Sequence, residues 1–131
     1  MISSESALIL TIAILNFTIG GFWYMLFGQK WALAWGLSQE QLNKKDPQPY
    51  LVALIGSIWT VYGMFLLIKH VRPQGMGELL GLAIGTWLFI VVGIGAKHYA
   101  FAKRSLTAFL IDYLLDLVSL IVISILLYLY H

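Results

Sequence analysis

The amino-acid sequence predicts an all-α fold, an integral membrane four-helix bundle with a short interfacial helical connector between its first two helices. Of the 131 residues, 60% are hydrophobic and 11% are charged, whereas about 25% are charged in a soluble domain. Four apolar runs are long enough to cross a hydrocarbon core of about 30 Å, which takes about 20 helical residues. We expect one membrane domain over residues 1–131, with helices at about 6–27, 50–68, 77–96 and 105–129.

The charge and cysteine content exclude several kinds of function. The net charge is +2, and Lys and Arg are spread over short polar segments, so the basic stripe of a nucleic-acid-binding protein is missing. The chain has no cysteine, which excludes disulfides and thiolate metal sites. It has no HExxH spacing, and no histidine falls at the depth of its membrane acids. We therefore expect no enzyme activity, no cofactor and no metal site.

The first apolar run and the segment after it set the start of the bundle. The run follows Met-Ile-Ser-Ser-Glu-Ser, which lacks the positive start of a signal peptide, so we expect a retained helix. Trp31 and Trp35 are spaced i,i+4, which predicts a short helix that presents both rings to the lipid interface. Ser38 and Gln41 have capping-box spacing and predict a second short helix. A docking surface for another protein is the alternative for this connector.

The distribution of Lys and Arg predicts the orientation. Six of the 8 basic residues lie in the first and third loops, and basic loops normally stay in the cytoplasm. We expect a multi-pass protein of the cell inner membrane with both termini outside and with loops 28–49 and 97–104 in the cytoplasm.

Small residues at helical spacing predict close packing between helices. Gly77, Gly81 and Gly85 form two overlapping GxxxG patterns on the third helix. The first two helices carry further small residues at such spacing, namely Gly20, Gly56 and Gly63. We favour packing within the bundle, and a homo-oligomer through the glycine face of the third helix is the alternative. The lipid bilayer is the other expected partner.

Two acids within the fourth helix are the most informative residues. Asp112 and Asp116 are spaced i,i+4 and share one face. A charged Asp near the bilayer centre costs at least about 2.5 to 3.5 kcal/mol, so this face should point inward. Asp116 falls near the midplane, and three residues of the other helices complete a predicted polar layer at that depth: Asn16, Thr60 and Thr86.

Asp112 lies one turn, about 6 Å, closer to the cytoplasm than Asp116. We expect Tyr24 and Ser57 within hydrogen-bonding reach of it. Desolvation and mutual repulsion oppose ionising both acids, so one should carry a proton at neutral pH. The layer then serves as a conduit for protons, a small cation or a small solute, or it only ties the helices together. A non-catalytic scaffold or subunit that binds a lipid or a partner membrane protein is the alternative function.

Residues 16–31 contain Gly-x-x-Trp-Tyr followed by Phe-Gly-x-x-Trp. This segment resembles the opening signature of the domain of unknown function 1761 family, and residues 36–42 and 111–119 resemble later segments of it. Members are small bacterial membrane proteins with four predicted helices, so the resemblance implies that fold. It implies no reaction, because the family has no established activity. The chain departs from the family at residues 25–26, where Ser-Pro is common, and at its two membrane aspartates, where amides are common.

Overall fold

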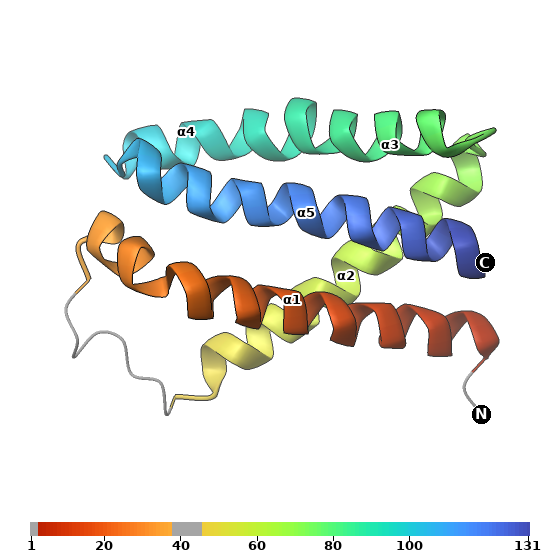
Figure 1. The fold of residues 1–131 in the computed structure, drawn as a ribbon, viewed down its shortest axis with the longest axis horizontal. Coiled ribbons are helices and arrows are strands. Elements are labelled where there is room, and N and C mark those ends of the chain that lie inside the picture. Colours follow the sequence, from red (N-terminus) through yellow and green to blue (C-terminus); the bar gives the residue numbers. More distant parts are fainter. Residues whose placement is uncertain (1–2, 38–45) are drawn as a thin grey trace.

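Four long apolar helices make up the computed structural model, which describes residues 3–37 and 46–131 (Figure 1). Each is long and apolar enough to cross a membrane, so the predicted all-α four-span fold is confirmed. Their bounds are α1 Ser4–Trp35, α2 Gln48–Val71, a third helix Met76–Phe101 and α5 Leu106–Tyr130. The third helix consists of α3 (Met76–Gly85), the π-helical segment η1 (Thr86–Val92) and α4 (Gly93–Phe101).

Local capping explains where two of the helices begin. The side chain of Ser3 accepts a hydrogen bond from the backbone N–H of Ser6 at 3.1 Å, and the side chain of Ser105 accepts one from Ala108. A serine at this position satisfies a backbone donor that the first helical turn leaves without a partner. At the other end of α1, Gly36 adopts a left-handed conformation with φ 73°, which glycine allows without strain and which ends the helix.

The structure corrects the predicted connector. α1 runs for 32 residues without a break, so Trp31 and Trp35 belong to its last two turns and not to a separate interfacial helix. No proline interrupts α1 before Gly36, which is why the helix continues beyond the apolar run. The second predicted piece, at Ser38 and Gln41, lies outside the described residues.

α5 is the central helix of the bundle. It packs against α1, α2 and the third helix, while α2 crosses the others diagonally (Figure 1). The beginning of α1, the end of α5 and the turn between α2 and α3 lie at one end of the bundle, which we call the termini end. The last turn of α1 and the turn between α4 and α5 lie at the opposite end, the loop end.

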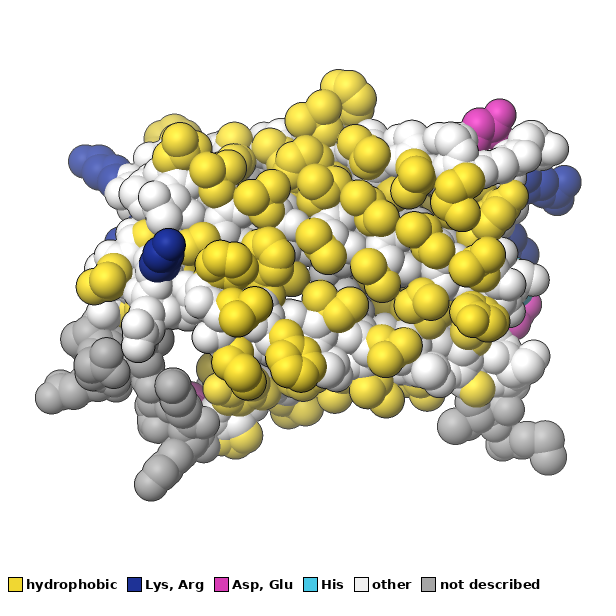
Figure 2. Space-filling model, in the orientation of Figure 1, with side chains coloured by type: hydrophobic (Ala, Val, Ile, Leu, Met, Phe, Trp, Pro, Cys, Tyr) yellow, Lys and Arg dark blue, Asp and Glu magenta, His cyan; other side chains and the backbone are white. Residues whose placement is uncertain are grey.

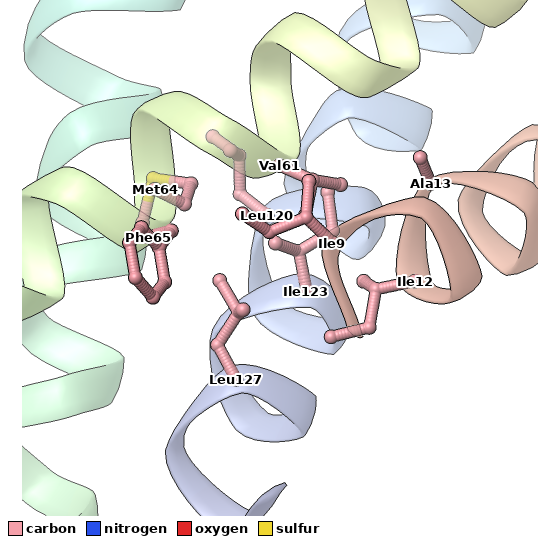
Figure 3. Close-up of a cluster of buried hydrophobic side chains, with 9 residues drawn as sticks. All are labelled: Ile9, Ile12, Ala13, Val61, Met64, Phe65, Leu120, Ile123 and Leu127. Carbon is pink, nitrogen blue, oxygen red and sulfur yellow. The ribbon is translucent and has the colours of Figure 1, made fainter. Parts of the chain in front are cut away.

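The half of the bundle toward the termini end has an apolar core. Nine buried apolar residues from α1, α2 and α5 form one cluster (Figure 3), which we call the apolar plug: Ile9, Ile12, Ala13, Val61, Met64, Phe65, Leu120, Ile123 and Leu127. Large hydrophobic side chains are also exposed along the outside of the helices. Figure 2 shows that they cover the middle of one face, whereas charged side chains gather toward the two ends. This distribution is that of a bundle surrounded by lipid.

Candidate functional site

Asp112 lies at the centre of a hydrogen-bond network in the loop-end half of the bundle. Its Oδ1 accepts a hydrogen bond from the hydroxyl of Tyr24 in α1. Its Oδ2 accepts one from the hydroxyl of Tyr99 in α4 and one from the indole N–H of Trp35 at 3.2 Å. Hydrogen bonds to a carboxylate are stronger than those between neutral groups. One side chain of α5 therefore holds the ends of α1 and α4 together.

Aromatic rings enclose this carboxylate. The ring of Trp35 packs edge-on against that of Tyr99 at 5.3 Å between centroids, and Tyr99 packs in the same way against Tyr113. Tyr24 packs edge-on against Trp31 at 5.5 Å. Such edge-to-face pairs are the favoured geometry of aromatic contacts. We call these five residues the aromatic cluster. It surrounds the carboxylate with apolar rings and supplies three of its donors.

Two tryptophans donate hydrogen bonds to the backbone of α5 on either side of Asp112. The indole N–H of Trp23 donates to the carbonyl of Ile111 at 2.9 Å, and that of Trp87 donates to the carbonyl of Tyr113 at 2.6 Å. Trp87 belongs to η1, and single π turns within α-helices occur frequently at functional sites. These bonds fix α5 from two neighbouring helices at the level of the acid. These two contacts were not predicted, because the residue type and position of both tryptophans are equally typical of interfacial or core aromatics.

Arg104 contacts both the backbone and the ring of Trp35, at the loop end of the network. Its Nη1 donates to the backbone carbonyl of Trp35 at 2.6 Å, and its guanidinium lies 4.8 Å from the centroid of the Trp35 ring. A cation near the last carbonyls of a helix and over an indole face is stabilising in both respects. Trp35 is thus held in place with its indole N–H directed at Asp112.

Asp116 differs from Asp112 in having no hydrogen bond to any described residue. It lies one turn further along α5, in the same stripe as Leu120, Ile123 and Leu127, which are buried in the apolar plug. The carboxylate therefore faces the interior of the bundle, as the sequence predicts, and is only partly exposed. A charge at this depth is costly without a partner.

The structure does not assemble the predicted polar layer. Asn16 donates to the hydroxyl of Ser57 at 2.9 Å, and Ser57 donates to the carbonyl of Ala13, so Ser57 pairs with Asn16 and not with Asp112. Thr60 is exposed, and its hydroxyl donates to Gly56 of its own helix. Thr86 likewise donates to Leu82. Threonine in a helix can satisfy its hydroxyl on a carbonyl four residues earlier, which removes the need for a partner across the bundle.

The predicted glycine contacts are also corrected. Gly77 and Gly81 are exposed, and a Cβ added at either would meet nothing within 4 Å. A Cβ added at Gly85 would meet only the side chain of Phe89, one turn further along the same helix, at 4.0 Å. A Cβ would also meet nothing within 4 Å at the other predicted packing positions: Gly20, Gly56 and Gly63.

The glycine that packs closely is Gly95, which lies outside the GxxxG pattern. It is buried, and the ring and hydroxyl of Tyr113 occupy the space that a Cβ would need. α4 can approach the aromatic cluster because this position has no side chain. Spacing alone could not single it out, since the partner that requires the space is on another helix.

Four membrane-crossing helices around a hydrogen-bonded carboxylate define a multi-pass membrane protein. Within residues 3–37 and 46–131, no three His, Cys, Asp or Glu side chains come together as metal ligands would. The sequence over residues 7–128 matches the family described as protein of unknown function (DUF1761), so the chain belongs to that family. Searches among curated proteins and among solved structures found no match.

Proposed function

We propose that this membrane protein is not an enzyme and that it binds protons at the Asp112–Asp116 pair, exchanging them with the loop-end side of the membrane. One observation carries the proposal. Asp116 points into the bundle without a hydrogen bond to any described residue, while Asp112, one turn away, already accepts three. An interior carboxylate without a partner needs a proton or another cation to offset its charge.

The groups around Asp112 suit a proton better than a larger ion. Its oxygens are engaged by the hydroxyls of Tyr24 and Tyr99 and by the indole of Trp35. A larger cation would have to displace these donors, whereas a proton needs none of them to leave. The two tyrosine hydroxyls and the two carboxylates supply groups that can hold a proton between the loop end and the middle of α5.

The other half of the bundle argues against an open pore. Beyond Asp116, the stripe continues through Leu120, Ile123 and Leu127, and the apolar plug fills the interior there (Figure 3). Ile123 and Val61 have no exposed surface at all. We therefore propose that protons reach the pair from the loop end and that passage beyond it requires the plug to rearrange.

A proton-flux measurement tests the proposal. Liposomes containing the purified protein and an internal pH-sensitive dye should acidify faster than protein-free liposomes under a membrane potential. Asp116→Asn should reduce the flux to the protein-free level, and Asp112→Asn should lower it. Glu78→Gln, the same chemical change at an exposed residue of the termini end, should leave it unchanged. Equal flux in the wild type and both aspartate variants would overturn the proposal and favour a scaffold role.

The distribution of basic residues also bears on which way the protein is oriented and in which membrane it lies. We propose an inner-membrane protein with the loop end in the cytoplasm and both termini outside. The support is the sequence distribution, in which six of the 8 Lys and Arg residues fall within residues 28–49 and 97–104, since segments rich in Lys and Arg normally stay in the cytoplasm. Reporter fusions at the C-terminus, active only outside the cytoplasm, test it. We expect this reporter to be active. An inactive reporter, with a second C-terminal reporter that works only in the cytoplasm being active, would reverse the direction of the proposed exchange.

We also propose that two copies pair through the glycine face of the third helix. The exposure of Gly77 and Gly81, with no neighbouring side chain, favours this alternative over packing within the bundle, since bare helix surface lets two backbones approach closely. Gly81→Leu should shift the detergent-solubilised protein from dimer to monomer in light scattering. A wild-type monomer would contradict the pairing.

A further inference from the structure

A groove separates the beginning of α1 from the end of α5 at the termini end. Its volume is about 780 Å³. Leu8 and Leu15 of α1 and Leu126 of α5 line its walls, and Glu5, Tyr130 and His131 lie at its mouth. Thr11 also lines the groove, and its hydroxyl donates to the carbonyl of Ala7 in its own helix. The groove is thus mainly apolar along its length and polar at one end. It is separate from the Asp112–Asp116 pair, which lies in the opposite half of the bundle.

The depth of the groove matches one leaflet of a membrane. The residues of α1 that line it run from Ser4 to Leu15, which at 1.5 Å per residue is about 16 Å along the helix. That is about half of a hydrocarbon core of about 30 Å. An acyl chain that starts at the mouth would therefore end near the middle of the bilayer.

Among the described residues that line the groove, Glu5 is acidic and His131 is basic. Oε1 of Glu5 and Nε2 of His131 are 3.2 Å apart, and the two side chains are 52% and 41% exposed. The imidazole packs edge-on against the ring of Phe65 at 4.9 Å between centroids, which holds it over the end of the bundle. The pair presents a carboxylate and an imidazole side by side at the depth of lipid headgroups.

We propose that this groove binds a phospholipid whose headgroup has a primary ammonium and a phosphate. The ammonium donates hydrogen bonds to Glu5, and the phosphate accepts them from the imidazole of His131 and the hydroxyl of Tyr130. One acyl chain lies along Leu8, Leu15 and Leu126. A quaternary ammonium has no N–H to donate, so a choline headgroup satisfies Glu5 less well. The charge complementarity of the mouth selects the headgroup, and the apolar walls hold the chain.

Thermal unfolding in detergent with added lipid tests the proposal. Because a ligand that binds the folded state raises the melting temperature, phosphatidylethanolamine should raise it more than phosphatidylcholine or phosphatidylglycerol does. Leu8→Trp, which fills the groove, should lose this extra shift. Leu114→Trp, on the exposed face of the same bundle, should keep it.

Glu5→Gln provides a second test at an exposed residue whose replacement does not touch the core. It should remove the preference for the ethanolamine over the choline headgroup while the chain still binds. Equal shifts by all three lipids in the wild type would overturn the proposal. So would an unchanged ethanolamine preference in Glu5→Gln, whether or not Leu8→Trp folds. Proton flux depends on neither residue, so the two proposals fail separately.

Discussion

The hydroxyl of Tyr24 donates a hydrogen bond to Asp112, 88 residues further along the chain. Tyr99 and Trp35 complete the set of donors, so a single carboxylate joins α1, α4 and α5. Its neighbour Asp116 makes no such bond to a described residue. The two acids share a helix face but differ in what their removal should do.

Removing one donor should weaken the link between α1 and α5. We expect Tyr24→Phe to lower the free energy of unfolding by about 0.6 kcal/mol and by no more than about 1.7 kcal/mol, the range found for hydrogen bonds between membrane helices. Tyr62→Phe is the matched control, because Tyr62 is 50% exposed and the new ring can still stack on Phe65. Unfolding in mixed detergent micelles measures both. Equal stability of the two variants would show that the Tyr24 bond contributes nothing.

The two acids should affect stability in opposite ways. Asp112→Ala leaves the donors of Tyr24, Tyr99 and Trp35 without their acceptor, and each unpaired buried group costs about 1 to 3 kcal/mol. Asp116→Asn removes a charge that no described residue compensates, so it should leave stability unchanged or raise it. The same unfolding assay compares them. Strong destabilisation by Asp116→Asn would mean that Asp116 is a structural residue.

Gly95 should not tolerate a methyl group. Gly95→Ala forces the Tyr113 side chain away from its contacts with Tyr99 and Phe109, and overpacking of this kind costs about 1 to 3 kcal/mol. Gly81→Ala adds the same methyl group where nothing lies within 4 Å, so its effect should stay within about 0.5 kcal/mol. If Gly81→Ala were the more damaging in detergent-solubilised monomers, the third helix would have to be rotated from the orientation described.

Ser57 should contribute more to stability than Thr60. Ser57 is 6% exposed, and Ser57→Ala leaves the amide of Asn16 without its partner at a cost of about 1 to 3 kcal/mol. Thr60 is exposed and bonds only its own helix, so Thr60→Val should change stability by less than about 0.5 kcal/mol. Thermal unfolding of the two variants compares their losses of stability. A larger loss in Thr60→Val than in Ser57→Ala would indicate that Thr60 faces the bundle interior.

Two parts of the structure could be predicted from the sequence: those that depend on the length of the apolar runs and those that depend on the cost of placing a charge in lipid. The four spans follow from runs of apolar residues, and the inward face of α5 follows from the cost of placing Asp112 and Asp116 in lipid. Tyr24 was expected near Asp112 from its depth alone, and the hydrogen bond is present.

What could not be predicted depends on how the helices rotate against one another. Tyr99, Trp35 and Trp87 reach α5 only because of the final packing, and their spacing in the sequence is equally suited to an interfacial position. The GxxxG pattern indicates a helix face but not which side of the bundle that face takes. Thr60 and Thr86 have polar side chains that their own helices satisfy, and depth counting cannot detect this.

Cysteine accessibility tests most directly that Asp116 faces an interior reached from the loop end alone. The chain has no cysteine, so single variants at Asp116, Val118 and Ile123 can be reconstituted and exposed to a water-soluble thiol reagent on one side of the membrane. Val118 faces outward and Ile123 lies in the apolar plug, so both should remain unmodified. Asp116→Cys should react, and only from the loop-end side. Modification of Asp116→Cys from the termini side, or no reaction from the loop-end side, would contradict the account.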